Sequence, residues 1–534
     1  MSKFIFVTGG LVPNIGKGTF AGSLARLLKN SGIRVNMLKI NPYLNIDPGT
    51  MSPYQHGEVF ITEDGTETDL DVGIFERFLD EDLKGGCHIT GGMVYSSVIN
   101  KERTGKYVGA TVQVVPHIVT EIKDRILGFA GENCDVTIVV LGGTLADYEN
   151  GVYLQAIRTV IGEVGEENAY LINLGLVPTL ETTGEPQVEV IETSVQKLMS
   201  FGLKPNSIIC RTSQETNFNA ETKKRIARRC FMASEKDVFH IPNVETIYEL
   251  PVVIKSEGID KHILDWFKIE TPSSDLSSWE NMVKGYKEKY PEVKVCIVGK
   301  YTKVQDAYLS IEEAIKHACT YNQIKPRIEF IDAEDVEEYG VERFLRGAKA
   351  IIVPPGWGSR GFNGMQMAVK YARENKIPYL GIGLGMQMAV IEFARNVLHL
   401  ENANTTEIDP NTDYPVVDVM EEQKSMVLNG KTMRLGAYEC VFDPNSVSFK
   451  LYGKELVSER HRHRYEFNSK YYDKFEENGM IMAGMNPQSK LIEVMELKNH
   501  PYFICTIFEP EYKSRPNKPH PLFLGLMNTS KSIR

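Results

Sequence analysis

Short runs of β-branched and aromatic residues recur along the chain, and longer helical patterns separate them. In the first half of the chain these runs cover residues 4–7, 35–40, 136–141, 170–174 and 207–210. Strands that are apolar on both faces are typical of a parallel sheet covered by helices, so the pattern predicts an α/β fold. The apolar residues after Thr19 recur at the spacing of one helix face, which supports this prediction (Phe20, Leu24, Leu27 and Leu28).

A chain of 534 residues is too long for one ordinary domain, and its character changes near residue 271. We expect residues 1–270 to form a first α/β domain. Residues 271–292 are turn-rich and then polar and helical, so we expect them to form a linker. Residues 293–534 are expected to form a second α/β domain, since apolar strand patterns resume there. Its predicted strands include residues 293–298, 350–353 and 378–382.

The charge balance and the cysteines limit the classes of partner. The chain has 70 acidic and 60 basic residues and a formal net charge of −10, so no basic surface for nucleic acid is expected. No apolar run approaches the ~18 residues of a membrane span, and the N-terminus lacks a signal-peptide pattern. The 8 cysteines are scattered without a CxxC pair, which is typical of a reduced compartment without structural zinc. We therefore expect a cytoplasmic protein without a nucleic-acid or membrane partner.

A glycine-rich turn joins the first predicted strand to the first predicted helix. It runs from Gly9 to Thr19 and places Lys17 at the helix start. Backbone N–H groups at a helix N-terminus bind anions, and a lysine adds positive charge, so the turn predicts a phosphate site. It departs from the strict phosphate-loop pattern because Gly18 precedes Thr19, and the alternative is a plain glycine-rich turn. Lys39 ends the next predicted strand, where it would either join this site or be a surface lysine.

Several longer stretches resemble the CTP synthase family, and together they extend over nearly the whole chain. They are residues 45–60, 64–71, 109–117, 401–404 and 460–466. The resemblance implies a P-loop-type parallel-sheet amidoligase domain followed by a class I glutamine amidotransferase-like α/β domain. It also implies the reaction of the family, in which ATP and Mg²⁺ serve to phosphorylate O4 of UTP. Ammonia released from glutamine then displaces the phosphate.

The resemblance also implies site residues in the first domain. Lys17, Lys39 and His56 match catalytic positions, and Asp71 matches a magnesium ligand. The implied ATP-binding residues are Gly10, Asn14, Ile15, Gly16, Lys17, Gly18, Thr19, Asp71 and Arg211. The implied acceptor-binding residues are Gln113, Gln187, Glu189, Glu192 and Arg225.

The second domain departs from the family at the positions that hydrolyse glutamine. Gly383 stands where the family has its nucleophilic cysteine, and glycine cannot form a thioester. Glu509 replaces the general-base histidine, so only the orienting acid Glu511 remains. Pro355 replaces the first glycine of the oxyanion turn and has no N–H to donate, which leaves Gly356. We therefore expect a degenerate domain without glutaminase activity.

The first domain departs from the family at one metal position. Val140 replaces a glutamate that is the second magnesium ligand of the family. Mg²⁺ prefers oxygen ligands, so the site is expected to lose one carboxylate. Asp147 or Glu149 would either replace the lost magnesium ligand or be an acid of the local loop.

The acceptor segment, residues 184–195, departs further. Gln187 and Glu189 replace two lysines, and Glu192 replaces a glutamine. Charge-assisted hydrogen bonds contribute about 1.5–3 kcal/mol each, so binding of a triphosphate is expected to weaken. The basic group at residues 223–225 would restore part of this binding or form a solvated helix face.

Three hypotheses for the function remain. We favour an ATP-dependent C–N ligase that uses free ammonia or another amine. Its default acceptor is UTP, and the alternative acceptor is a different carbonyl compound. The first alternative is a catalytically impaired paralogue that co-assembles with an active CTP synthase and regulates it. The second alternative is a nucleotide-binding ATPase without a transfer step. The resemblance also implies a homotetramer, and filament formation is left open.

Overall fold

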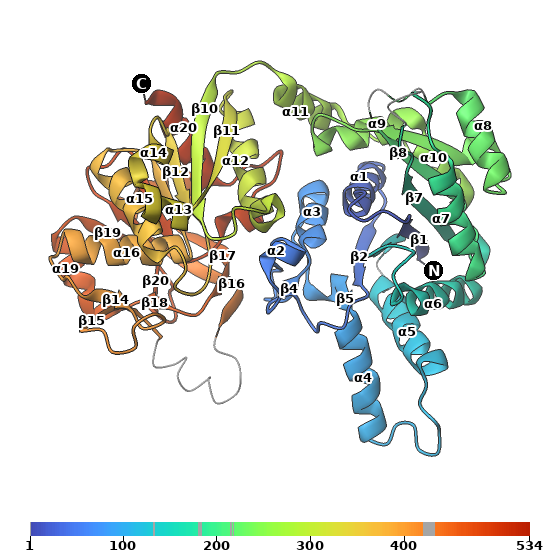
Figure 1. The fold of residues 1–534 in the computed structure, drawn as a ribbon, viewed down its shortest axis with the longest axis horizontal. Coiled ribbons are helices and arrows are strands. Elements are labelled where there is room, and N and C mark those ends of the chain that lie inside the picture. Colours follow the sequence, from blue (N-terminus) through green and yellow to red (C-terminus); the bar gives the residue numbers. More distant parts are fainter. Residues whose placement is uncertain are drawn as a thin grey trace. The chain divides into compact units, whose positions relative to one another are not determined.

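The apolar run at the N-terminus forms strand β1 (Lys3–Gly9), which lies at the middle of a seven-stranded sheet in the computed structural model. The structure describes residues 2–131, 134–179, 184–213, 216, 218–419 and 433–533. The chain forms two compact units (Figure 1). The first contains Met1–Pro48 and Asp71–Lys287, and the second contains Gly49–Leu70 and Glu288–Arg534.

The sheet of the first unit is parallel throughout, as the sequence predicts. Its strand order is β5-β2-β6-β1-β7-β8-β9. The strands besides β1 are β2 (Val35–Asn41), β5 (His88–Thr90), β6 (Val136–Leu141), β7 (Ala169–Leu176), β8 (Ser207–Thr212) and β9 (Val238–Pro242). The helices of this part of the chain are α1 (Lys17–Asn30), α3 (Leu70–Leu79), α4 (Gly91–Arg103), α5 (Val119–Ala130), α6 (Asn150–Val164), α7 (Glu189–Ser200), α8 (Ala220–Arg229), α9 (Leu250–Glu257), α10 (Ile259–Phe267) and α11 (Ser277–Lys287).

Helices cover both faces of this sheet because successive strand side chains alternate between the faces. Phe4 and Phe6 of β1 join the core that α4, α5 and α6 cover. Helix α1 contacts β1, β2 and β6 and packs against α9. The predicted apolar face of α1 is confirmed, since its four apolar residues after Thr19 are buried. Figure 1 shows α4 and α5 running side by side.

The second unit is built on a nine-stranded mixed sheet with the order β11-β10-β12-β13-β21-β20-β19-β16-β17. The first five of these strands are parallel, and the remaining pairs are antiparallel. Their bounds are β10 (Glu292–Gly299), β11 (Lys325–Asp332), β12 (Ala350–Val353), β13 (Tyr379–Ile382), β16 (Arg434–Phe442), β17 (Leu456–His463), β19 (Met480–Met485), β20 (Ile492–Leu497) and β21 (Phe503–Thr506). A small separate sheet contains β14 (Ala403–Thr405), β15 (Tyr414–Asp418) and β18 (Glu466–Phe467). The three strands predicted for this domain are confirmed as β10, β12 and β13.

Helices cover both faces of the parallel part of this sheet. Val298 and Val353 lie in the core on the side of α15 and α16, whereas Ile297 and Ile352 lie in the core on the side of α12 and α20. The helices are α12 (Leu309–Tyr321), α13 (Ala333–Tyr339), α14 (Val341–Leu345), α15 (Phe362–Glu374), α16 (Leu384–Asn396), α18 (Val447–Tyr452), α19 (Tyr472–Glu477) and α20 (Pro521–Ser532). In the described ranges of the chain, no helix has the length and apolar character needed to cross a membrane.

Residues 49–70 belong to the second compact unit although they lie early in the sequence. They contain α2 (Pro53–His56) and a two-stranded sheet of β3 (Phe60–Ile61) and β4 (Glu67–Thr68). Arg460 of β17 binds this segment through Nε to Glu63 Oε2 at 2.8 Å and through Nη1 to Ile61 O at 2.9 Å. The division of the sequence into domains 1–270 and 293–534 with a linker at 271–292 stays a prediction.

Candidate functional site

The turn between β1 and α1 has the backbone geometry of an anion-binding loop. Gly16 precedes the helix with φ +82°, a left-handed conformation that favours glycine, and Asn14 has φ +54°. Among the described residues, no side chain caps α1 and no acid lies in its first turn. The first N–H groups of a helix lack partners within the helix, so this turn is suited to hold phosphate oxygens.

Two lysine side chains reach the pair of glycines that follows β6. Lys17 Nζ donates to Gly143 O at 2.5 Å. Lys39 Cε lies 3.6 Å from the position that a Cβ on Gly142 would take. Both lysines are buried. Their positive charge is therefore concentrated at the carboxyl edge of the sheet, where the sequence predicts the phosphate site.

Asp71 lies in the first turn of α3, against Lys39 and Gly18. Lys39 Nζ and Asp71 Oδ2 form an ion pair. A Cβ on Gly18 would lie 2.1 Å from Asp71 Oδ1, so only glycine leaves room for this carboxylate. The replacement of the usual hydroxyl residue at position 18 therefore has a steric reason.

Arg211 adds a cation beside the same turn. Its Nη1 lies 3.2 Å from the position that a Cβ on Gly16 would take, and its Nε donates to Asn243 Oδ1 at 3.2 Å. Burial lowers the pKa of Arg211, but a guanidinium keeps its charge in proteins. Among the other residues implied for ATP binding, Ile15 is buried, Gly10 is buried against Gly175, Thr19 is half-buried and Asn14 is exposed.

The carboxylates near the turn fit a magnesium ion that a nucleotide helps to hold. Val140 is buried in β6, and Glu149 is exposed. Asp147 accepts hydrogen bonds from Thr144 N at 2.7 Å and Thr144 Oγ1 at 2.9 Å, which favours its role as an acid of the local loop. In the described part of the chain, no three acidic, histidine or cysteine side chains form a group that could hold a metal. Mg²⁺ commonly takes one or two carboxylates with substrate phosphates, so Asp71 fits this mode of binding.

The two acidic replacements in the acceptor segment lie on α7 and pair with one arginine of α8. Arg229 Nη1 forms an ion pair with Glu189 Oε1, and its Nε lies 3.4 Å from Glu192 Oε2. Backbone hydrogen bonding at the helix start and the hydrogen bond from Arg229 lower the pKa of Glu189. Arg229 therefore partly neutralises both carboxylates.

Of the other predicted acceptor residues, two lie near α7 and α8 and one lies elsewhere in the chain. Arg225 Nη2 donates to Pro186 O at 2.9 Å, next to half-buried Gln187, so these two join the α7–α8 group. Gln113 is exposed and precedes the short helix η2 (Val114–Ile118). His56 ends α2 in the second unit, so the structure gives no arrangement of this residue with Lys17 and Lys39.

The second unit carries a strand-turn-helix elbow at Gly383. Strand β13 ends at Ile382, Gly383 has φ +54° and ψ −106°, and α16 begins at Leu384. The N–H of Gly383 donates to Thr506 O at 2.8 Å. This is the sharp turn that presents a nucleophile at the end of a strand, and it persists here without a side chain.

The predicted base and oxyanion positions meet at this elbow. A Cβ on Gly383 would lie 3.3 Å from Glu509 Oε1 and 3.5 Å from Pro355 Cβ. Glu509 is 1% exposed, and no side chain of the described residues donates a hydrogen bond to its carboxyl group. Burial raises the pKa of Glu509 to about 8, although the charge of Arg462 opposes this rise. The group that faces the empty nucleophile position is thus a buried carboxyl rather than an imidazole.

Glu511 is a second buried carboxyl group, and it borders a small cavity. It lies in the short helix η8 (Pro510–Lys513), and burial and the charge of Glu509 raise its pKa well above the usual value. The cavity has a volume of about 60 Å³, and Glu511, Pro355 and Gly356 are among its lining residues. Arg462 is also among its lining residues, so a basic and an acidic residue border the same cavity.

Lys300 is a buried cation beside the oxyanion turn that the sequence analysis missed. It directly follows β10, is 2% exposed, and donates from Nζ to Trp357 O at 2.9 Å and to Gly358 O. Burial lowers its pKa to about 8. Lys300 therefore holds the turn through its carbonyl groups. A lysine directly after a buried strand is the sequence signal that could have identified it.

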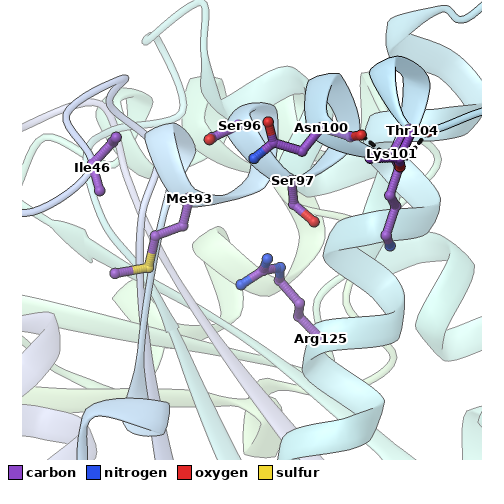
Figure 2. Close-up of a pocket in the computed structure, with 8 residues that line it drawn as sticks. All are labelled: Ile46, Met93, Ser96, Ser97, Asn100, Lys101, Thr104 and Arg125. Atoms are coloured by element: carbon purple, nitrogen blue, oxygen red, sulfur yellow. Dashed lines mark hydrogen bonds between the residues drawn. The ribbon is translucent and has the colours of Figure 1, made fainter.

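A larger cavity of about 510 Å³ lies on α4 and α5 of the first unit (Figure 2). It is lined by Ile46, Met93, Ser96, Ser97, Asn100, Lys101, Thr104 and Arg125. Glu121 pairs with both of its cations, with Lys101 Nζ at 2.5 Å and with Arg125 Nε at 2.8 Å. These eight lining residues include none of the residues predicted for ATP, metal or acceptor binding.

Two family descriptions match the chain, one for each half. "CTP synthase N-terminus" matches residues 3–269. "Glutamine amidotransferase class-I" matches residues 303–529.

Full-length relatives and one solved domain are also similar to this chain. A CTP synthase of Caldanaerobacter subterraneus subsp. tengcongensis is 50% identical over 537 residues, which cover 100% of this chain and 99% of the relative. A CTP synthase of Carboxydothermus hydrogenoformans is 47% identical over 531 residues, which cover 99% of each chain. The solved glutaminase domain of Trypanosoma brucei CTPS with bound acivicin is 32% identical, covers 45% of this chain and 95% of its own, and has a TM-score of 0.43.

Proposed function

The chain belongs to the CTP synthase family, and we propose that it is an ATP-dependent C–N ligase whose amine donor is free ammonia rather than glutamine. One observation carries this proposal. The elbow at Gly383 has no nucleophilic side chain, and the buried carboxyl group of Glu509 faces the place that a side chain would take.

Loss of glutaminase activity follows from the chemistry of these positions. Amide hydrolysis through a thioester requires a thiolate and a base that accepts its proton. Gly383 supplies no thiol, and a carboxyl group whose pKa is raised to about 8 is mostly protonated at neutral pH, so Glu509 is a poor base. Cys505 of β21 does not substitute for the nucleophile, because it is buried in the core and burial raises the pKa of its thiol.

The ligase step is assigned to the first unit. Lys17, Lys39 and Arg211 bind the phosphates of ATP, and Asp71 would hold Mg²⁺, which neutralises phosphate charge when it is bound. The γ-phosphoryl group passes to the carbonyl oxygen of the acceptor and ADP leaves. Ammonia then adds to the carbonyl carbon, a proton is lost to solvent, and phosphate leaves with the former carbonyl oxygen. Positioning and charge stabilisation are the contributions of the protein.

UTP is the acceptor of the family and therefore the first candidate. One observation favours a second candidate acceptor. Glu189 and Glu192 place two carboxylates where basic or neutral residues would meet a triphosphate, and Arg229 already binds both. An acceptor with fewer phosphates would avoid their repulsion. The homotetramer, filament formation and cytoplasmic location stay predictions, as does the catalytic role of His56.

Glutamate release and CTP formation test the proposal together. The purified full-length chain would be incubated with ATP, Mg²⁺ and UTP, and with either ammonium chloride or glutamine. We expect ADP and CTP with ammonium and no glutamate from glutamine. Glutamate release would overturn the proposal. ADP without CTP from any uridine nucleotide would favour the ATPase alternative, and neither product would favour the impaired paralogue.

A further inference from the structure

A cavity of about 810 Å³ lies in the first unit, at the amino ends of β7, β8 and β9. Its lining residues include Ala169 at the start of β7, Asn206 just before β8 and Asp237 just before β9. These strands are parallel, so this edge of the sheet is opposite the edge that carries Arg211 and the phosphate turn. The cavity is therefore separate from the site proposed for ATP.

Apolar side chains form much of the cavity wall, and one of them is a large exposed ring. Leu171 and Leu203 are buried, whereas Trp266 of α10 is 42% exposed. Trp266 Nε1 donates to Ala169 O at 3.1 Å. Its ring and that of Tyr170 form a T-shaped pair with centroids 5.8 Å apart. The indole is therefore held in place and offers part of its surface to an apolar ring of a ligand.

Gly162 leaves the cavity open on the side of α6. It lies in the last turn of the helix, and glycine within a helix is unfavourable relative to alanine. Beyond the neighbouring backbone of α6, no described atom lies within 4 Å of the position that a Cβ on Gly162 would take. Packing therefore does not require a glycine here, and its effect is to leave space along the cavity wall.

Two cations of the wall lie on adjoining elements and are available to a ligand. Arg158 Nη1 lies 3.1 Å from the position that a Cβ on Gly202 would take, so the guanidinium reaches the loop that contains Lys204. Both cations are exposed, and neither forms an ion pair with an acid of the described residues. Arginine and lysine in this state bind carboxylates through charge-assisted hydrogen bonds.

The acids of the wall leave a net positive charge for the ligand. Asp237 Oδ1 lies 3.4 Å from His262 Nε2, and Asp265 pairs with Lys261 at 3.1 Å. Glu166 is an exposed acid, and no described cation pairs with it. The two unpaired cations and this one acid sum to a single positive charge. A monoanion such as a carboxylate therefore suits the wall better than a dianion.

We propose that this cavity binds a small aromatic carboxylate. The ring contacts Trp266 and the apolar wall, and the carboxylate binds Arg158 and Lys204. Ligand sites of this volume are typically apolar with a few placed polar groups, as this one is. The site goes beyond the proposed ligase function, because its ligand is neither ATP nor the acceptor.

NMR of a fluorinated probe, 4-(trifluoromethyl)benzoate, measures binding without any catalytic step. The full-length chain should broaden the ¹⁹F resonance, because the bound probe tumbles as slowly as the protein. Three analogues each lack one feature, and we expect each to bind at least tenfold more weakly. They are 4-(trifluoromethyl)benzamide without the charge, 4-(trifluoromethyl)cyclohexanecarboxylate without the aromatic ring and 4-(trifluoromethyl)benzylammonium with the opposite charge.

Variants of the wall locate the bound probe. Arg158→Gln and Lys204→Gln should each weaken binding about tenfold, because each removes a charge-assisted hydrogen bond. Gly162→Leu should abolish binding, since leucine fills the space beside α6 and is the better helix former. Arg228→Gln makes the same chemical change as Arg158→Gln at an exposed position of α8 outside the wall, and it should leave binding unchanged.

Several results would overturn the inference. They are a spectrum without broadening at millimolar probe, equal binding of the amide or the ammonium analogue, and unchanged affinity in all three wall variants. Displacement of the probe by ATP with Mg²⁺ would place it at the phosphate turn and would also contradict the inference. The measurement needs neither ammonia nor an acceptor, so failure of the ligase proposal leaves it unaffected.

Discussion

At the residue scale, three positions around the elbow at 383 are expected to control the chemistry of the second unit together. The variant Gly383→Cys alone should release no glutamate, because Glu509 and Pro355 leave the thiol without a base and with an incomplete oxyanion turn. The triple variant Gly383→Cys, Glu509→His and Pro355→Gly should restore measurable glutaminase activity. Glutamate release measured by chromatography checks both outcomes, and activity of the single variant would contradict the account.

The buried carboxyl group of Glu509 also predicts how stability depends on pH. Its pKa is raised from 4.5 to about 8 in the folded state, so the folded chain binds more protons than the unfolded chain between these values. Stability should therefore fall as pH rises from about 4.5 to about 8, by at most ~1.4 kcal/mol per pH unit from this group.

The variant Glu509→Gln isolates this contribution from the other titrating groups. Glu511 titrates in the same direction, while Arg462 and Arg434 oppose the shift of Glu509 through their charge. Denaturant unfolding of both proteins should show that the variant gains stability relative to the wild type as pH rises through the window. A constant difference across the window would show that Glu509 is not shifted.

At the element scale, the pairing of α7 with α8 sets the charge of the acceptor segment. Replacing both Glu189 and Glu192 by Gln removes two carboxylates that would repel a triphosphate. We expect affinity for UTP to rise about tenfold, while affinity for uridine stays the same, as measured by calorimetry. Glu221→Gln, an exposed acid of α8, is the matched control. Unchanged UTP affinity would show that these two positions do not face the phosphates of the acceptor.

Elements with continuous apolar runs could be predicted from the sequence, and those with polar cores could not. Strands β1 and β6 consist mostly of apolar residues because helices cover both faces of their sheet. Strand β17 contains buried Arg460 and His461, whose acidic partners Glu63 and Glu493 are remote in the sequence. No local pattern reveals such pairs, because only the fold brings the charges together.

The candidate sites show the same limit. The phosphate turn is local, so a strand, glycines and Lys17 predict it directly. The room that Gly18 leaves for Asp71 depends on a contact across 53 residues of sequence, and only the structure shows it. Lys300 was missed because its role depends on the carbonyl groups of Trp357 and Gly358.

At the scale of the whole molecule, the chain should unfold as two units with separate sensitivities. Glu63, in the early segment, binds Arg460 Nε at 2.8 Å and Lys513 Nζ at 2.9 Å, and Arg460 is fully buried. The variant Glu63→Ala should therefore destabilise the second unit by about 1–3 kcal/mol. Calorimetry would resolve the transitions, and ATP should raise only that of the first unit.

The exposed acid Glu477 provides a matched control for the variant Glu63→Ala. Glu477→Ala removes an exposed acid of the second unit and should leave both transitions in place. If Glu63→Ala lowered the transition that ATP stabilises, and not the other, residues 49–70 would belong energetically to the first unit.

The origin of the transferred nitrogen tests the central claim most directly. The full-length chain would be given ATP, Mg²⁺, UTP, unlabelled ammonium and glutamine that carries ¹⁵N in its side-chain amide. Mass spectrometry of the aminated product measures which donor was used. The account predicts a product without label and intact labelled glutamine, whereas a labelled product would show that the second unit still releases ammonia from glutamine.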